Sequence, residues 1–341
     1  MTDLPAASGA DAFGLLLDDP ELAAAVTDGM ARVEQGLRES VGHVDNYIAT
    51  TAGHLLEAGG KRFRPLLTLL ASQVGPQAGK VSDDVVKAAV VVELTHLASL
   101  YHDDVMDEAL MRRGSQSANA RWGNTVAILT GDLLFARASQ VVSDLGADAV
   151  RVQAMTFETL CSGQIRETVG PADGEDAVEH YLTVLAEKTG VLIATAGRFG
   201  AWFSGCDDGT TEVMRQYGER IGVAFQLADD LIDLSSQAEQ SGKTPGTDLR
   251  EGVATLPVLF ARQSDDPADA RLLELLDGDL TDDVRHAEAL ELLRAHPAME
   301  RARVQTREWA QAARQALEPL PDSPVKSALA TLADGVVERT A

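Results

Sequence analysis

Several long stretches of the chain are apolar on nearly every face of a helix, which limits how the chain can fold. The clearest is VVKAAVVVELTHLASLYH, over 85–102, and GVLIATAGRFGAWF, over 190–203, has the same character. Apolar residues at helical spacing predict α-helices, and strand-like alternation is not convincing anywhere. A helix that is apolar nearly all round lies inside a larger bundle or lines a greasy cavity. The sequence therefore predicts an all-α chain with buried helices.

Helical segments follow one another with short breaks, and no low-complexity linker divides them. The best loop candidate is SSQAEQSGKTPGTDLREG, over 235–252. Residues 1–19 mix Pro, Gly, Ser and Asp, which predicts a flexible N-terminal arm before one all-helical domain over 20–341. The predicted helices are 20–40, 43–58, 62–75, 82–108, 117–143, 147–169, 176–204, 209–236, 253–264, 282–294, 298–317 and 323–338.

Composition excludes several classes of protein. The formal net charge of −24 argues against a nucleic-acid partner, which requires a basic surface. Two cysteines in 341 residues indicate a reduced, cytoplasmic protein rather than a disulfide scaffold. The acidic N-terminus lacks the basic and apolar regions of a signal peptide. No uninterrupted apolar run approaches the length of a transmembrane segment, so none is predicted.

The segment SLYHDDVMDEALMRRG places three carboxylates directly after an apolar run. Asp103 and Asp107 are four residues apart and Asp104 and Asp107 three apart, so each pair shares a helix face. Like charges at this spacing repel unless a cation lies on them. Oxygen ligands favour Mg²⁺ or Mn²⁺ over zinc, and Mg²⁺ is typically held by one or two carboxylates plus substrate phosphates. The cluster is a candidate magnesium site, with a solvated helix face as the competing interpretation.

The same spacing occurs twice more, so the spacing alone is weak evidence. FQLADDLIDL repeats the triplet as Asp229, Asp230 and Asp233, again inside an apolar helix, where aspartate is uncommon unless paired or metal-bound. RQSDDPADA also repeats it, from Asp265 to Asp269, but its proline indicates a turn before the next helix. We therefore interpret the first two triplets as metal-binding and the third as structural.

Basic residues are few but some cluster. EAGGKRFRPLL carries Lys61, Arg62 and Arg64 at a predicted helix start, where backbone N–H groups also attract anions. Arg62 is interpreted equally well as an ordinary surface charge. Arg112 and Arg113 follow the first triplet, and a guanidinium matches the geometry of phosphate oxygens.

Three further polar residues are weaker candidates when each is taken alone. Lys188 and Lys243, each followed by threonine, are individually more typical of a surface than of a site. His96 lies seven residues before Asp103, two turns back on the same face, where an anion would lie. A single histidine there is more often a satisfied core residue.

Several motifs in order give the chain a resemblance to the trans-isoprenyl diphosphate synthases, the polyprenyl synthetase family. The matching segments are GGKRFRP (59–65), ELTHLASLYHDDVMD (93–107), RRG (112–114), GQ (163–164), EKTG (187–190), FQLADDLID (225–233) and GKTPGTDLREG (242–252). One such motif alone is weak evidence, whereas several in the family's order are strong.

The resemblance implies an all-α bundle, a homodimer, in which both acidic triplets face one central active-site cavity. It implies a prenyltransferase that adds isopentenyl diphosphate to an allylic diphosphate by 1′-4 head-to-tail condensation. Two or three Mg²⁺ ions, with Mn²⁺ as a substitute, would neutralise the departing diphosphate. The resemblance implies that metal ions are bound by Asp103, Asp107, Asp229 and Asp233, and that catalysis involves Asp104, Asp230, Lys188, Gln226 and Lys243. It implies that the allylic diphosphate is bound by Arg112, Lys188, Thr189, Gln226 and Lys243. It implies that isopentenyl diphosphate is bound by Lys61, Arg64, His96 and Arg113.

Product length depends on small residues before the first triplet. In the family, bulky aromatics one turn above that triplet block the growing product, whereas this chain has Ala98 and Ser99 there. We therefore expect a trans-polyprenyl product longer than geranylgeranyl diphosphate, with Phe135 or Phe157 as a deeper wall. One departure is Val253, where many members have a lysine after DLREG. It removes one cationic contact to the allylic diphosphate.

Other functions stay open at this point. A geranylgeranyl or farnesyl diphosphate synthase would differ only in product length. His102-Asp103 superficially resembles the pair of a metal-dependent phosphohydrolase, but that class leaves GGKRFRP unexplained. A non-catalytic partner subunit would not need intact acidic triplets. A terpene cyclase would not need a second diphosphate site.

Overall fold

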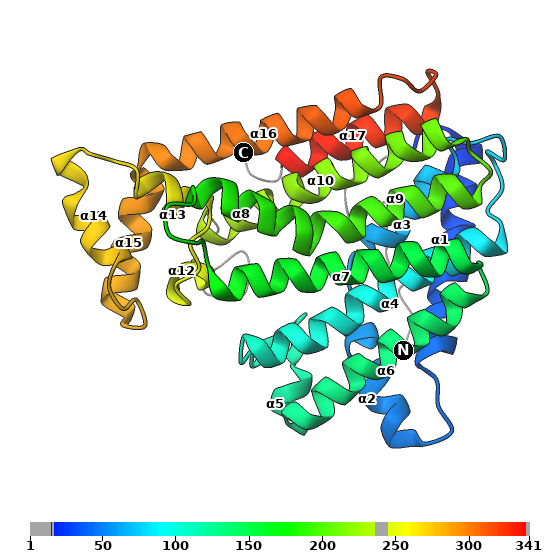
Figure 1. Cartoon of the computed structure of the whole chain (residues 1–341), viewed down its shortest axis with the longest axis horizontal. Coiled ribbons are helices and arrows are strands. Elements are labelled where there is room, and N and C mark those ends of the chain that lie inside the picture. Colours follow the sequence, from blue (N-terminus) through cyan, green and yellow to red (C-terminus); the bar gives the residue numbers. More distant parts are fainter. Residues whose placement is uncertain (1–14, 16, 236–244, 339–341) are drawn as a thin grey trace. The chain divides into compact units, whose positions relative to one another are not determined.

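The computed structural model describes residue 15, residues 17–235 and residues 245–338 (Figure 1). Most of the described residues are helical and very few are in strands, which confirms the predicted all-α fold. The N-terminal arm predicted over 1–19 lies almost wholly outside the described residues and stays a prediction. Lys243, predicted to bind the allylic diphosphate, also lies outside them.

The order of elements follows the predicted helices closely. The α-helices are α1 Pro20–Val41, α2 Asn46–Glu57, α3 Phe63–Ser72, α4 Asp83–Met106, α5 Ala118–Trp122, α6 Asn124–Ser143, α7 Ala147–Val169, α8 Ala177–Leu185, α9 Val191–Phe203, α10 Asp208–Ser235, α12 Thr247–Arg250, α13 Leu256–Ala261, α14 Ala270–Leu276, α15 Asp283–Ala295, α16 Pro297–Ala316 and α17 Pro324–Glu338. A π-helical turn, η2 Ala186–Gly190, joins α8 to α9, and a 3₁₀ turn, η3 Pro267–Asp269, precedes α14.

Four features differ from the prediction. The helix expected over 117–143 is interrupted at Gly123, and the one over 176–204 contains the π-helical turn η2. The short helices α12 and α14 were not predicted. A two-stranded antiparallel hairpin, β1 Met111–Arg112 with β2 Ser115–Gln116, was also missed. All four are short, and periodicity over a few residues carries little information.

Helix α4 is the buried helix that its composition predicts. Ser82 begins it, because its hydroxyl accepts a hydrogen bond from the Val85 N–H at 3.2 Å. Asp83 and Asp84 occupy the first turn, where the helix dipole favours acids. Most of the remaining residues are buried, since α4 packs against α1, α3 and α6. The first acidic triplet therefore emerges at the end of a helix fixed on several sides.

The chain divides into two compact units, each described by itself. The first contains the described residues of Met1–Glu158, Leu192–Gly218 and Ala316–Leu332, so it holds GGKRFRP and the first triplet. The second contains those of Thr159–Val191, Glu219–Gln315 and Ala333–Ala341, including the second triplet. Its core is formed by residues such as Leu227, Leu231 and Leu293. The single domain predicted over 20–341 stays a prediction.

Helix α6 is long and apolar enough to cross a membrane by length and composition, with a mean hydropathy of 1.3. The sequence analysis predicted no such segment. One helix of this kind is weak evidence for a membrane span, because core helices of globular proteins pass the same test. Here α6 packs against α2, α4 and α5 within the first unit.

Candidate active site

The first acidic triplet contains two kinds of aspartate. Asp104 is fully buried, and burial raises the pKa of its carboxyl group. The Nε–H of Arg112 donates to Asp104 Oδ1 at 2.6 Å, while Oδ2 has no hydrogen-bond partner among the described residues. Asp103 is half-buried and Asp107 is exposed. The middle aspartate is thus buried and bonded to Arg112, while the outer two are accessible.

The β1–β2 hairpin positions Arg112 and Arg113. Arg113 (φ 53°) and Gly114 (φ 75°) form its two-residue turn, and two consecutive positive φ values match the right-handed twist of the strands. For arginine this conformation costs about 1–2 kcal/mol, so surrounding contacts must hold it. The Nη1 group of Arg113 supplies such contacts by donating to the carbonyl oxygens of Leu55, at 2.9 Å, and Gly59. The glycine in RRG was the sequence signal for this turn.

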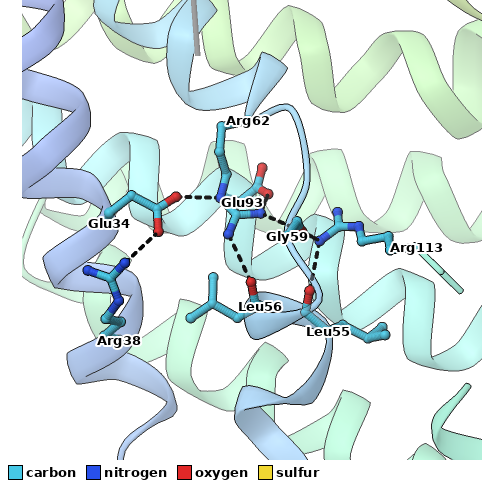
Figure 2. A network of polar contacts seen from close by, with 8 residues as sticks. All are labelled: Glu34, Arg38, Leu55, Leu56, Gly59, Arg62, Glu93 and Arg113. Carbon is cyan, nitrogen blue, oxygen red and sulfur yellow. Dashed lines mark hydrogen bonds and ion pairs between the residues drawn. The ribbon is translucent and has the colours of Figure 1, made fainter. Parts of the chain in front are cut away.

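Arg62, in GGKRFRP, is not a surface residue. Its side chain is 7% exposed and forms ion pairs with Glu34 at 2.6 Å and Glu93 at 3.3 Å (Figure 2). The interpretation of Arg62 as an ordinary surface charge is therefore wrong. Its backbone is left-handed, with φ 54°, at the N-cap of α3. Gly60 has a φ of 140°, which L side chains rarely adopt, and a Cβ atom there would lie 2.8 Å from Arg62 Nη1 and 2.9 Å from Arg113, so glycine is favoured between the two guanidinium groups.

Arg64, His96 and Arg113 form a cationic cluster in the first unit. Burial lowers the pKa of Arg64 to about 10, while Glu93 and Asp103 oppose that shift and Arg113 adds to it. The Nε of Arg64 is buried without a hydrogen-bond partner in the part of the chain that is described. Burial and four arginines, Arg64 first, hold the pKa of His96 well below its usual value. Lys61 is exposed three residues before Arg64.

The charges and the unpartnered donor of this cluster suit an anion. A buried donor without a partner loses the hydrogen bonds that it made to water, unless a ligand supplies an acceptor. Neighbouring arginines repel each other, and a diphosphate would relieve that repulsion. The neutral imidazole of His96 can still donate one hydrogen bond. The four residues predicted for one diphosphate therefore come from the same unit, and three of them influence one another's charge.

The second acidic triplet, on α10, repeats the division found in the first. Asp230 is 5% exposed, while Asp229 and Asp233 are half-buried. Burial raises the pKa of Asp230 to about 6, although hydrogen bonds from Tyr181 and Gln226 oppose the shift. The Tyr181 hydroxyl donates to Asp230 Oδ2, and the Gln226 amide donates to Oδ1 at 3.0 Å.

Gln226 also joins the second triplet to EKTG. Its Oε1 accepts a hydrogen bond from the Thr189 hydroxyl at 3.3 Å. Lys188, in the same π-helical turn, forms an ion pair with Glu167 of α7. A Cβ atom on Gly163 would lie 2.7 Å from the backbone nitrogen of Lys188, so α7 and η2 are in direct contact there. Turns of the π type often occur at functional sites.

Sequence reasoning missed Asp248 beside the second triplet. Burial, with the charges of Asp230 and Asp233, raises the pKa of Asp248 to about 7. Its backbone N–H donates to Asp233 Oδ2 at 3.2 Å, and the Gly246 N–H donates to the Asp233 carbonyl at 2.9 Å. The signal was available, because Asp248 belongs to the TDLREG segment already recognised as a motif.

The two residues predicted to set product length differ in accessibility. Ala98 is fully buried, and Gly131 of α6 packs against its carbonyl group. Ser99 is half-buried, with its hydroxyl donating to the His96 carbonyl at 2.8 Å. In the same unit, the ring centroids of Phe135 and Phe157 lie 4.2 Å apart.

The donor set of the two triplets suits magnesium. Within the described residues, no group of three or more His, Cys, Asp or Glu side chains could hold a metal ion alone. The carboxylates of the two triplets offer oxygen ligands, which hard divalent cations such as Mg²⁺ and Ca²⁺ accept together with water and phosphate oxygens. The outer aspartates offer only oxygen and remain accessible, as such binding requires.

The third triplet is structural, as predicted. The Asp266 carboxylate accepts from the Ala268 N–H at 2.9 Å and begins the 3₁₀ turn η3. Asp269 accepts from the Ser264 hydroxyl at 2.5 Å and contacts His296 Nε2 at 3.0 Å. The carboxylates of Asp266 and Asp269 are thus occupied by contacts within the protein at a helix start.

An all-helical chain with these sites is an isoprenoid synthase in fold. The Polyprenyl synthetase family model matches residues 45–293. Nonaprenyl diphosphate synthase of Mycobacterium tuberculosis is 51% identical over 326 residues, which cover 96% of this chain and 97% of that protein. A geranylgeranyl pyrophosphate synthase of Corynebacterium glutamicum, solved with calcium and isoprenyl diphosphate, is 47% identical with a TM-score of 0.85 and covers 95% of this chain and 99% of that one.

A third similar structure is a decaprenyl diphosphate synthase of Rhodobacter capsulatus, 34% identical, with a TM-score of 0.83, over 94% of this chain and 100% of that one. The match extends over nearly the full length of each relative. The chain belongs to the polyprenyl synthetase family, as its motifs predicted, and is a prenyltransferase.

Proposed function

We propose that this chain is a magnesium-dependent trans-polyprenyl diphosphate synthase, which condenses isopentenyl diphosphate with an allylic diphosphate by 1′-4 head-to-tail addition. One observation supports it above the others. The buried Nε of Arg64 has no partner among the described residues, and the charges of both Arg113 and Asp103 affect the pKa of Arg64. A site for a bare diphosphate thus adjoins a site for a metal-bound one. A cyclase or a phosphohydrolase would need only one.

The proposed division of labour follows from the contacts. Asp103, Asp107, Asp229 and Asp233 would hold the metal ions, whose charge stabilises the departing allylic diphosphate. Arg112, Lys188, Thr189, Gln226 and Lys243 would bind that diphosphate, and Lys61, Arg64, His96 and Arg113 would bind isopentenyl diphosphate. For Asp104 and Asp230 we propose a positioning role, because each is buried against a polar partner, Arg112 and Gln226 respectively.

The chain's residues then perform binding, orientation and charge stabilisation. The two diphosphate sites hold the alkene against the allylic carbon, which converts a bimolecular step into an oriented one. Cations aimed at the departing diphosphate stabilise the charge that develops on it. The proton lost in the last step goes to the released diphosphate, so the proposal requires no protein base.

For the product we propose a chain longer than geranylgeranyl diphosphate. The nonaprenyl and decaprenyl names of two similar proteins support this, as do the small side chains of Ala98 and Ser99. The Corynebacterium protein, named for geranylgeranyl pyrophosphate, favours the shorter alternative. The Phe135–Phe157 pair is the candidate wall at which elongation stops.

We further propose a cytoplasmic homodimer. Ile128 and Leu129 of α6 are 42% and 61% exposed, and an exposed apolar group on a helix of this length favours contact with a second copy. Cys161 and Cys206 are both free, which favours a reducing compartment.

The test is an elongation assay with purified protein, Mg²⁺, isopentenyl diphosphate and farnesyl diphosphate, followed by sizing of the products. We expect products longer than geranylgeranyl diphosphate, and we expect Asp103→Ala to abolish turnover. Asp265→Ala is the matched control, since Asp265 opens the structural triplet, and it should retain full activity. The absence of elongated product with any allylic primer would overturn the proposal. Loss of farnesyl diphosphate without isopentenyl diphosphate would favour a cyclase or a phosphohydrolase.

A further inference from the structure

Arg62 is bonded almost completely by the protein itself. Its guanidinium group makes four hydrogen bonds: Nε donates to Glu34, Nη1 donates to Glu93 and to the Gly59 carbonyl, and Nη2 donates to the Leu56 carbonyl. A guanidinium carries five N–H groups, so little of it remains for a ligand. Arg62 is therefore unsuited to bind substrate, although it lies between Lys61 and Arg64 in the sequence.

Arg62 and Arg113 share one anchor, the last turn of α2 and the Gly59 carbonyl just beyond it. Arg113 donates to the carbonyls of Leu55 and Gly59, and Arg62 donates to those of Leu56 and Gly59 (Figure 2). The last carbonyls of a helix lack partners within it and carry the negative end of its dipole, so they attract cations. The Gly59 carbonyl thus joins the two arginines, and Gly60 fits between their guanidinium groups.

Glu93 is the buried countercharge of this arrangement. It is 2% exposed on α4, and its Oε1 lies 3.3 Å from Arg62 Nη1. Its charge is also the largest one opposing the effect of burial on both Arg64 and Arg113. A carboxylate beside an anion-binding cluster weakens the attraction for that anion. Its presence is therefore explained better by keeping three crowded guanidinium groups in place.

We propose that Glu93 and Arg62 are positioning residues for the isopentenyl diphosphate site: Glu93 holds Arg62, and Arg62 fixes the Gly59–Gly60 turn against which Arg113, Lys61 and Arg64 are aligned. Neither residue touches the substrate. The inference rests on the proposed function and deepens it. It states that a carboxylate, rather than another cation, holds the basic residues of the binding site in place.

The deciding variant is Glu93→Gln, which keeps the size of the side chain and one acceptor for Arg62 but removes the charge. We expect the KM for isopentenyl diphosphate to rise about tenfold, equivalent to about 1.4 kcal/mol. The kcat at saturating substrate should stay within threefold, and the KM for farnesyl diphosphate within twofold. A merely structural role would lower stability without separating the two KM values. Glu93→Asp retains the charge, so its KM should lie nearer that of the wild type.

Glu34→Gln is the comparison variant. It removes the charge of the other carboxylate bound to Arg62 and leaves the Glu93 charge near Arg64 and Arg113 unchanged. The Glu34 side chain is 26% exposed. We expect its KM for isopentenyl diphosphate to change less than threefold. An equal rise in both variants would overturn the role of the shared charge. An unchanged or lower KM in Glu93→Gln would overturn it as well, because electrostatic relief would then outweigh positioning.

Calorimetric titration of isopentenyl diphosphate into each folded variant separates this inference from the proposed function. Weaker binding to Glu93→Gln than to the wild type supports the inference, whether or not the wild type elongates a primer. If the wild type elongates a primer, and Glu93→Gln and Glu34→Gln bind isopentenyl diphosphate equally well, the inference is overturned but the proposed function is not. Should Glu93→Gln not fold, Glu93→Asp and Arg62→Lys carry the same test, and normal binding by both would reject the proposal.

Discussion

At the scale of single residues, the middle carboxylate of each acidic triplet differs from the outer two in burial and in its hydrogen bonds. Asp104 and Asp230 are buried and receive hydrogen bonds from Arg112 and from Tyr181 and Gln226. The outer aspartates remain accessible. Spacing in sequence cannot make this distinction. Asp103 and Asp104 lie four and three residues before Asp107, and either spacing places a residue on the same helix face as Asp107. Burial decides it, since a buried carboxylate requires a partner that the protein supplies.

Replacing Asp104 therefore tests a positioning role. Asp104→Asn keeps an acceptor for Arg112 Nε, so we expect kcat to fall about tenfold. Asp104→Ala leaves Arg112 without that acceptor, and we expect a fall of about 100-fold, the range typical of residues that orient ligands. Steady-state kinetics, with thermal unfolding as a check on folding, measure both. Equal loss in the two variants would contradict the role of the hydrogen bond.

At the scale of elements, α4 carries residues for three purposes along one continuous helix. Glu93 lies beside the cationic cluster and His96 belongs to it, Ala98 and Ser99 follow, and the acidic triplet ends the helix. Because α4 is held by α1, α3 and α6, these groups keep fixed spacings. The helix was predicted over 82–108 and spans Asp83–Met106. The β1–β2 hairpin was not, because four strand residues give no usable period, although it determines the directions of Arg112 and Arg113.

The product-length prediction belongs to α4. Ser99→Phe places an aromatic ring one turn before Asp103 at a half-buried position, so we expect the main product to become shorter. Ala98→Phe should act in the same direction but also destabilise the fold, since Ala98 is fully buried against α6 and overpacking costs about 1–3 kcal/mol. Chromatography of the dephosphorylated products measures length. An unchanged distribution in both variants would reject this pair as the determinant.

At the scale of the whole molecule, an acidic chain concentrates its buried cations where an anion would bind. The formal net charge is −24, yet Arg62, Arg64 and Arg113 lie close together in the first unit. Long-range attraction of the chain for diphosphates is therefore weak, and local donors and metal ions must supply the affinity.

The homodimer is tested at the same scale. Leu129→Glu introduces a charge on the exposed apolar part of α6, and we expect the molar mass in solution to fall from that of a dimer to that of a monomer. Val284→Glu is the control, because Val284 is 75% exposed on α15, in the second unit. Size-exclusion chromatography with light scattering gives the mass. A wild-type monomer, or a dimeric Leu129→Glu, would contradict this use of α6.

The sequence alone determined the helical architecture and the family, and it predicted the chemical nature of the sites. Helical periodicity, oxygen-only ligands and ordered motifs are properties of neighbouring residues, so they can be recognised without tertiary structure. For the same reason the triplet at Asp265–Asp269 was set aside correctly, because Pro267 marks a turn locally.

Only the tertiary structure decided that Arg62 is buried and paired, and only it revealed Glu93 and Asp248. The carboxylates that bind Arg62 lie 28 residues before it and 31 residues after it, on α1 and α4. Asp248 meets Asp233 across 15 residues of chain. Whether a charged side chain is solvated or buried depends on which distant segments fold around it, and no local pattern records that contact.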